Sequence, residues 1–546
     1  MSSAMCYPIF MRWFFIVLLS TIYYLLSTPL VHAASEFTSS YTSTYQVVKD
    51  LPTHVIHDIK ITNNLAHIFL TRYTFSVSGA SLNNLYVTDG VTKLPFTLDT
   101  SNGQATLTIQ FPNPVIGYNQ TQNLIISYDS QDLVESIGET MAINVPRISY
   151  SNEAKDYTRI VKVKGINPQP AYLYPPPTST TTDADWNVYT YTQNSSDSLS
   201  LLFGEQVNYQ IDLRYLLKNP ELSSLTSELA LPPDTPYQQI ILDQIDPKPI
   251  TITLDSDGNY LARYNLKPQE KLWVTARIYA TISPVPRFLD PSSNSLPPDA
   301  APPYWDTRSL AVTSLAKQLK SPLNFYNYLT ENFHYNYDLA LNGTTRVGTT
   351  AALENPNRVV CTEFTDTFIS LARSNQIASR EINGYAYSSN PRLRPLTSSV
   401  DVLHSWPEYF STESKQWLQL DPTWGSTTGG VDYFNKLDFS HIAFVRHGAE
   451  PDYPLPPGMY KNDSSEKTIS VSVATELPPR QEKSAIINNQ LQNQGNVLIF
   501  HPDYGYVPPF GLASKLSTTS TSLYDKIKTL CVNFFSKFWA RRPASM

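Results

Sequence analysis

Apolar and polar residues alternate in short runs through the first part of the chain, a pattern that predicts β-strands. Residues 73–77 (YTFSV) and 105–111 (ATLTIQF) place an apolar side chain at every second position. Asp-Gly at 89–90 and Asn-Gly at 102–103 lie between such runs and are typical of turns. We therefore expect an antiparallel β-sandwich-like domain over residues 36–150.

A second β-rich domain is expected over residues 155–283. Residues 252–262 read as a hairpin around Asp257-Gly258, and residues 272–278 read as a further strand. Residues 284–303 are rich in proline and serine, which is typical of a linker.

After this linker, the spacing of apolar residues changes from every second position to the period of a helix. Residues 309–319 predict a helix, and apolar residues at 364, 368, 371 and 372 mark one face of another helix. Cys361 then lies at or just before the first turn of that helix. Unpaired backbone N–H groups at a helix start favour an anion, so they would stabilise a thiolate and an oxyanion.

Two short runs with period two follow, at 404–410 and 415–421, and the polar residues between them suit a hairpin loop. Pairing residue 410 with residue 415 places His404 directly opposite Asp421. Opposite residues in an antiparallel pair have Cβ atoms roughly 4.5–5.5 Å apart. The carboxylate could then bond one imidazole nitrogen and leave the other facing the thiol.

A thiol, an imidazole and a carboxylate are the groups that nucleophilic acyl transfer requires. Each residue alone has a structural explanation: Cys361 as a small packed side chain, His404 as a structural strand residue, and Asp421 as a turn starter. Their combination with the predicted hairpin register favours a catalytic triad. No phosphate-binding loop and no zinc spacing of His and Cys are found, so we expect no cofactor and no metal.

Several motifs resemble the transglutaminase-like domain, a papain-type cysteine-nucleophile fold. The resemblance covers about residues 305–448 and is carried by Gly384-Tyr385, His404-Ser-Trp-Pro-Glu and Leu420-Asp-Pro-Thr. The family has a glycine two positions before its cysteine, where this chain has Val359. Pro407 is unusual inside a strand and predicts either that this hairpin is at a sheet edge or that residue 407 is on the unpaired side.

The resemblance implies a transglutaminase-like α+β domain over residues 304–450, after two β-sandwich-like modules. It implies that Cys361 attacks an amide carbonyl of a protein or peptide, with His404 as base and Asp421 as its partner. Water as acceptor would make the protein a protease or amidase, and an amine would make it a cross-linking enzyme. The alternative is a catalytically degenerate binding or scaffold protein of the cell surface.

Composition restricts the class of protein further. The 546 residues carry a net charge of −7, which does not suggest nucleic-acid binding. The chain has 42 prolines, 35 tyrosines and few charges, as expected of a β-rich extracytoplasmic protein. Its three cysteines, Cys6, Cys361 and Cys531, make a poor disulfide framework.

The two ends of the chain predict export and contact with membranes. Residues 1–33 resemble a signal peptide with cleavage after Ala33, or alternatively an uncleaved anchor. Residues 451–522 predict a proline-rich segment, one strand at 468–473 and a partly disordered tail. Residues 523–546 predict a basic amphipathic helix that lies on a membrane or docks on the protein itself. We expect a secreted or membrane-associated protein, and a membrane-surface adhesin or assembly factor is a third hypothesis.

Overall fold

The structure is a computed structural model. It describes residues 36–101, 104–146, 154–165, 170–192, 198–288, 304–342, 345–388, 390–396, 403–463, 465–478, 499–501 and 505–507. The predictions for residues 1–33, for most of the 284–303 linker and for the 523–546 helix lie outside these residues. Within them, none of the helices is both long enough and apolar enough to cross a membrane.

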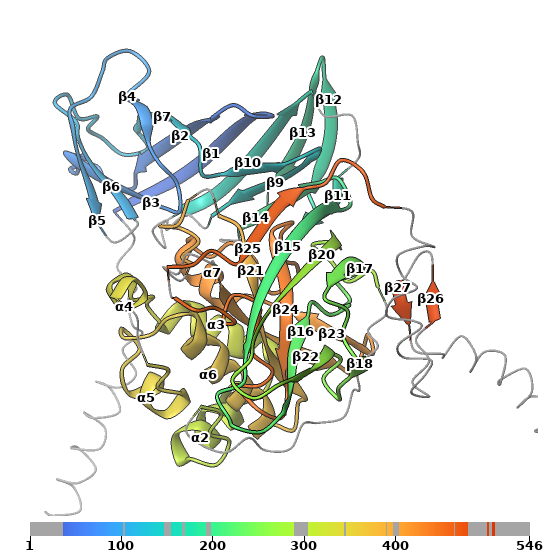
Figure 1. Cartoon of the computed structure of the whole chain (residues 1–546). Coiled ribbons are helices and arrows are strands. Elements are labelled where there is room, and N and C mark those ends of the chain that lie inside the picture. Colours follow the sequence, from blue (N-terminus) through green and yellow to red (C-terminus); the bar gives the residue numbers. More distant parts are fainter. Residues whose placement is uncertain are drawn as a thin grey trace, which may run out of the picture.

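The N-terminal β region, residues 36–203, contains fourteen strands in three sheets. The largest sheet has the order β12-β13-β10-β1-β2-β7-β4, and the others are β3-β6-β5 and β11-β14-β9-β8 (Figure 1). One hydrophobic cluster includes side chains from all three sheets, such as Val55, Leu107 and Leu201. The strands are β1 (Phe37–Val48), β2 (Thr53–Asn63), β3 (Arg72–Ser78), β4 (Asn83–Thr88), β5 (Phe96–Ser101), β6 (Gln104–Gln110), β7 (Thr121–Ser130), β8 (Val134–Ile137), β9 (Thr140–Val145), β10 (Ala154–Lys164), β11 (Pro170–Tyr174), β12 (Ser179–Asp183), β13 (Trp186–Tyr191) and β14 (Leu199–Phe203).

This region extends past the expected boundary between residues 150 and 155. Strand β10 pairs in parallel with β1, from Ser40 opposite Asp156 to Val48 opposite Lys164. Residues 154–203 therefore belong with the first sheets and not with a second domain. Alternation along the chain identifies a strand but not its partner, which is why the boundary was placed too early.

The middle β region, residues 207–282 together with strand β25 from later in the chain, forms the sheets β17-β20-β15-β25 and β16-β19-β18. The predicted hairpin is β18 and β19, which pair in antiparallel fashion around Asp257-Gly258. The strand predicted at 468–473 is β25, and it pairs with β15. The strands are β15 (Val207–Lys218), β16 (Leu225–Leu231), β17 (Gln238–Asp246), β18 (Thr251–Leu254), β19 (Tyr260–Leu266), β20 (Lys271–Ile282) and β25 (Ile469–Val473).

The last large region combines six helices with the antiparallel sheet β23-β22-β21-β24. Helix α6 packs against β21 and β22, and its buried face includes Phe364, Phe368 and Leu371, as the helical period predicts. The elements are α2 (Leu310–Leu319), α3 (Pro322–Asn332), α4 (Tyr337–Asn342), α5 (Thr349–Glu354), α6 (Cys361–Ser374), β21 (Ser379–Ala386), β22 (His404–Ser411), β23 (Gln416–Gln419), α7 (Pro422–Thr427) and β24 (His441–His447).

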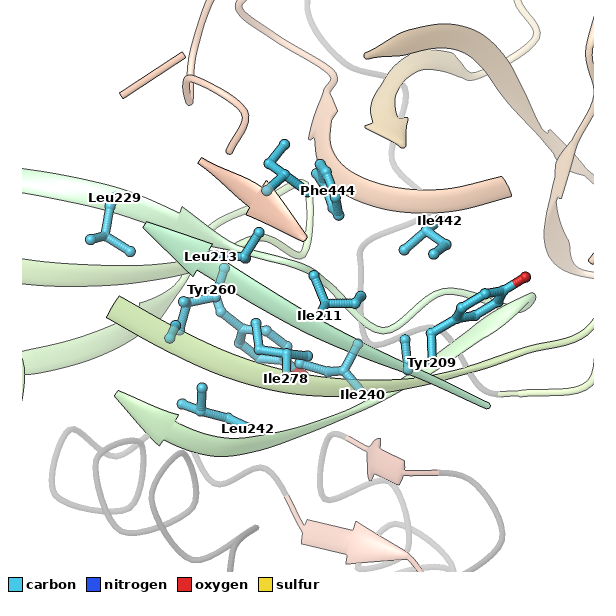
Figure 2. Close-up of a cluster of buried hydrophobic side chains, with 14 of the residues drawn as sticks. Tyr209, Ile211, Leu213, Leu229, Ile240, Leu242, Tyr260, Ile278, Ile442 and Phe444 are labelled. Carbon is cyan, nitrogen blue, oxygen red and sulfur yellow. The ribbon is translucent and has the colours of Figure 1, made fainter. Parts of the chain in front are cut away.

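A shared hydrophobic core joins this sheet to the middle β region. Ile442 and Phe444 of β24 pack in one cluster with Ile211, Ile240 and Ile278 (Figure 2). All five side chains are buried. Because β24 also carries His441, the middle β region supports one wall of the site described next.

Candidate functional site

Cys361 is the first residue of α6, as the periodicity predicts, and its side chain is buried with 2% exposure. The extended backbone of Val360 precedes it, and the Val360 N–H donates to Glu363 Oε2 at 3.0 Å. Within the described part of the chain, the N–H groups of Cys361 and Thr362 donate to no acceptor. They remain available to bind an oxyanion beside the sulfur.

His404 begins β22 and faces Asp421. Its Nε2 lies 2.9 Å from Asp421 Oδ2, and its Nδ1 has no hydrogen-bond partner other than Cys361 among the described residues. The ring is stacked between Trp424, at 5.1 Å and 21°, and Trp406, at 5.8 Å and 26°. Two indoles in this arrangement fix the plane of the imidazole.

Neighbouring charged groups determine the protonation state of His404. Burial by itself lowers the pKa of its imidazole, but the charge and hydrogen bond of Asp421, together with the neighbouring Cys361, raise this pKa to about 9. With Nε2–H bonded to Asp421, Nδ1 is the nitrogen that can exchange a proton with the thiol.

Asp421 caps α7 and accepts four hydrogen bonds. Oδ1 accepts from the Thr423 and Trp424 N–H groups at 2.9 and 3.1 Å. Oδ2 accepts from His404 and, at 3.2 Å, from His441 Nε2. Burial would raise the pKa of Asp421, but the two imidazoles lower it to about 2.

A close approach of two elements requires glycine just after this cap. A Cβ on Gly425 would lie 2.2 Å from the Tyr326 hydroxyl oxygen. That hydroxyl accepts from the Tyr433 N–H at 3.0 Å, so it ties α3 to the segment after α7. The glycine therefore lets α3 pack against α7 and hold Asp421 in place.

The predicted hairpin register is wrong by two residues. Phe410 pairs with Trp417, and not with residue 415 as expected. The last pair before the loop is Ser411 with Gln416, so the loop is residues 412–415 and not 411–414, and Lys415 within it adopts a left-handed conformation with φ 55°. A shift of two keeps every side chain on its predicted face, so Asp421 still reaches His404.

The hairpin of β22 and β23 lies at the edge of the sheet, as expected, with β23 as the edge strand; Pro407 itself lies on β22, between β21 and β23. Its carbonyl accepts the Leu420 N–H at 3.2 Å, so its amide side faces the point where β23 has ended at Gln419. The missing N–H thus lies just beyond the last ladder pair, Glu408 with Gln419, where the ladder does not require it, in agreement with the second expectation as well.

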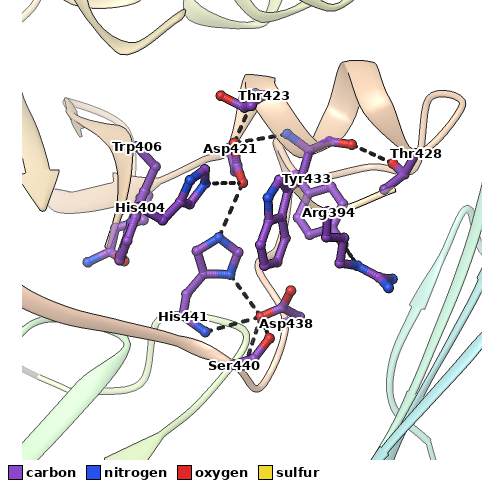
Figure 3. A network of polar contacts seen from close by, with 12 residues as sticks. Arg394, His404, Trp406, Asp421, Thr423, Thr428, Tyr433, Asp438, Ser440 and His441 are labelled. Carbon is purple, nitrogen blue, oxygen red and sulfur yellow. Dashed lines mark hydrogen bonds and ion pairs between the residues drawn. The ribbon is translucent and has the colours of Figure 1, made fainter. Parts of the chain in front are cut away.

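Sequence reasoning missed the role of His441, for which no partner pattern was found. Its Nε2 lies near Asp421, and its Nδ1 lies 2.8 Å from Asp438 Oδ1 (Figure 3). The signal that could have found it is the spacing of Asp438 and His441 at the start of a strand. That spacing is too common to identify a site without the fold.

His404, Asp421 and His441 also form the one group of three ligand-type side chains found close together in the described part of the chain. Their ligand atoms lie within 4.8 Å of one another. Both imidazole Nε2 atoms already direct a proton to Asp421 Oδ2, so a metal would have to displace both protons. The hydrogen bonds account for this geometry, and the expectation that no metal is bound stays a prediction.

Tyr335 interacts electrostatically with Cys361 and is itself largely buried. It forms a bridge with Val359, and its hydroxyl is buried without a hydrogen-bond partner in the described structure. Burial, and then the charge of Cys361, raise its pKa. The same residue lines a groove of about 840 Å³, whose other wall includes Ser78 and Gln104 of the N-terminal β region.

Residues 309–422 match the family model of the transglutaminase-like superfamily. The match includes Cys361, His404 and Asp421 and ends before Asp438 and His441. The chain therefore contains a transglutaminase-like domain, and the predicted family is confirmed. Among curated proteins, no sequence matches the chain.

Several solved structures are similar to parts of the chain. A proposed cysteine protease from Cytophaga hutchinsonii is 14% identical with a TM-score of 0.27, covering 50% of this chain and 99% of that one. The periplasmic domain of TgpA from Pseudomonas aeruginosa is 17% identical with a TM-score of 0.23, covering 42% and 92%. An M1 zinc metallopeptidase from Deinococcus radiodurans is 13% identical with a TM-score of 0.22, covering 35% and 46%. Scores this low carry no conclusion about activity.

Proposed function

We propose that the protein is a cysteine acyl-transfer enzyme that acts on amide bonds of proteins or peptides. The observation that carries this proposal is the paired use of His404: Nε2 bonds to Asp421, and Nδ1, which bonds to no other described residue, is left to interact with the Cys361 thiol. The family match supports a cysteine enzyme in general, and the triad is our own assignment.

In the first half of the reaction, Nδ1 of His404 holds the proton taken from Cys361, and the Sγ of the resulting thiolate bonds to the amide carbon. The Cys361 and Thr362 N–H groups stabilise the oxyanion. The C–N bond then breaks, and His404 returns its proton to the departing amine. Asp421 stays ionised throughout, holding the ring and stabilising its cationic form.

In the second half, a nucleophile releases the acyl group. Water gives its proton to His404 as its oxygen attacks the thioester, and the Cys361 thiolate leaves and regains that proton. With water the product is a carboxylic acid; with a primary amine the product is a new amide bond. The groove of about 840 Å³ that reaches Tyr335 is where we propose that the protein or peptide approaches.

The test is an activity-based thiol probe offered to the wild type and to Cys361→Ala, with peptide and amine acceptors together. Wild-type protein should be labelled at Cys361 and should release acid or cross-linked product. Cys361→Ser, which keeps the side-chain shape, should do neither. A Cys361 no more reactive than free cysteine near neutral pH would overturn the proposal.

One observation favours a second candidate, a binding or scaffold protein with an occluded site. The side chains of Cys361, His404 and Asp421 are all at most 2% exposed. If the scaffold candidate is correct, iodoacetamide should label Cys361 only after denaturation. If the enzyme candidate is correct, Tyr335→Ala should speed labelling in the folded protein, because it removes the ring beside the sulfur.

We also propose that the protein is extracytoplasmic and associates with membranes through residues 1–33 or 523–546. The support is the sequence pattern of these segments. Deleting residues 523–546 and following membrane fractionation tests the second segment. A truncated protein that still pellets with membranes would exclude that segment as the anchor.

A further inference from the structure

A second histidine and a second carboxylate continue the Cys-His-Asp arrangement into the protein. His441 lies between Asp421 and Asp438, at 3.2 Å from the first and 2.8 Å from the second. His441 is 4% exposed, and neither carboxylate exceeds 1%. His441 and Asp438 both lie outside residues 309–422, which match the family model.

The hydrogen bonds determine the charge of His441. Each ring nitrogen faces a carboxylate oxygen, and an ionised carboxylate can only accept. Both nitrogens must therefore carry a proton, which makes the ring an imidazolium. Trp424, at 4.5 Å, and Trp406, at 4.9 Å, hold the same ring edge-on.

We propose that His441, held as an imidazolium by Asp438, is a positioning residue that keeps Asp421 ionised and oriented toward His404. This inference rests on the proposed function. Asp421 Oδ1 is held by the start of α7, and His441 holds Oδ2, so the plane of the carboxylate is determined from both ends. Without His441, the carboxylate could rotate or take up a proton.

Charged groups from three other parts of the fold surround this chain of contacts. Glu135 of β8 interacts with His441 and Asp438, Arg394 interacts with Asp438, and Lys436 donates to Asn144 Oδ1 of β9 at 3.1 Å. Arg394 also donates to the Tyr433 hydroxyl at 2.9 Å. The N-terminal β region thus contributes to the environment of the site. The titratable groups that face His441 are Glu135, His404, Asp421, Tyr433 and Asp438, while Arg394 and Lys436 act on Asp438.

The experiment measures the rate of Cys361 alkylation by iodoacetamide against pH. In the wild type, a pair of Cys361 thiolate and His404 imidazolium should make the alkylation rate constant over a range of pH. At the alkaline end of this plateau the rate should change as His404 loses its proton, and this change is called the alkaline limb. His441→Gln keeps a hydrogen-bond donor for Asp421 but removes the positive charge of the His441 ring. The ring centroids of His441 and His404 are 5.8 Å apart. With Asp421 still held by the new donor, the alkaline limb should move upward by about one pH unit, because a like charge no longer opposes protonation of His404. His441→Leu removes the donor as well, so the limb should move downward, because Asp421 is no longer held toward His404.

Two further variants separate positioning from a purely structural role. Asp438→Asn added to His441→Gln should move the limb part of the way back, because it removes the negative charge left behind. The control is His447→Gln on the same strand, where the ring bonds to the Pro454 carbonyl instead. It should lower stability and leave the limb in place.

The outcomes distinguish this inference from the proposed function. No plateau in the wild type would overturn the triad itself. A plateau whose limb is the same in wild type and His441→Gln would overturn only the role of His441. If His441→Gln does not fold, ¹⁵N spectra of histidine in the wild type decide: at pH 7.5 His441 should be an imidazolium, and a neutral ring would overturn the inference.

Discussion

Two buried histidines in this protein have opposite electrostatic environments. His57 lies in the core of the N-terminal β region, where Ser43 Oγ is 2.7 Å from Nδ1 and the Tyr128 hydroxyl is 3.2 Å from Nε2. His441 is equally buried but lies between two carboxylates. Burial lowers the pKa of His57 to about 3, whereas Asp438 and Asp421 overcome burial and raise that of His441 to about 9.

The difference shows that partners, and not burial, determine which histidine carries charge. Hydroxyl groups can accept or donate, so they satisfy a neutral ring. Carboxylates only accept, so they require a protonated one. His404 belongs with His441, because its carboxylate partner Asp421 dominates its environment.

The largest effect should come from making the His404 environment resemble that of His57. Asp421→Asn replaces the carboxylate by a neutral amide, so the catalytic rate should fall by roughly 10³–10⁴-fold. The rate of acyl release measures this loss. The matched control is Asp129→Asn, which makes the same change at the partly exposed His54–Asp129 pair of the N-terminal β region. An equal loss in both variants would contradict a specific role for Asp421.

Removing a carboxylate from His441 tests the stability of the buried pair. Asp438→Ala leaves a buried imidazolium with one partner in place of two, so the free energy of unfolding should fall by about 3–5 kcal/mol. Chemical denaturation followed by tryptophan fluorescence measures the change, since Trp406 and Trp424 contact the ring. A change below about 1 kcal/mol would mean that His441 is neutral in the folded protein.

The two histidines should also give stability opposite pH dependences. The folded pKa of His441 is above its unfolded value, so its contribution is complete below about pH 6.5 and is lost as the pH rises through 9. The folded pKa of His57 is below its unfolded value, so stability falls as the pH drops from 6.5 toward 3. Each slope should be about 1.4 kcal/mol per pH unit.

Two variants show which histidine causes each slope of stability against pH. His441→Gln should reduce the alkaline slope by about half, because His404 has the same raised pKa and keeps its contribution. His57→Gln should flatten the acidic side between pH 6.5 and 3. Thermal unfolding over a pH series measures both. Unchanged slopes in these variants would assign the pH dependence to other groups.

The smallest effect should come from Ser43→Ala, which leaves His57 Nδ1 without its partner. A buried polar atom that loses its hydrogen bond costs about 1–3 kcal/mol. The midpoint of unfolding should fall, while the alkylation rate of Cys361 stays at the wild-type value. A reduced alkylation rate would instead show that the two regions are coupled.

The positions of Cys361, His404 and Asp421 could be predicted because they follow from the periodicity of neighbouring residues in the sequence. The helical period of 364, 368, 371 and 372 places Cys361 at a helix start, and the structure has α6 begin there. Alternation assigned His404 and Asp421 to facing positions, and an error of two residues in register did not change their faces.

The amino-acid sequence by itself determined where strands and helices lie, which side chains share a face, and which residues supply a thiol, an imidazole and a carboxylate. Only the tertiary structure decided that β10 pairs with β1, that Cys361 is buried, and that His441 and Asp438 stand behind Asp421. Periodicity is a property of neighbouring residues, whereas these contacts form between elements that packing brings together. The charge of a buried histidine follows from such contacts, so it could be known only once the fold was known.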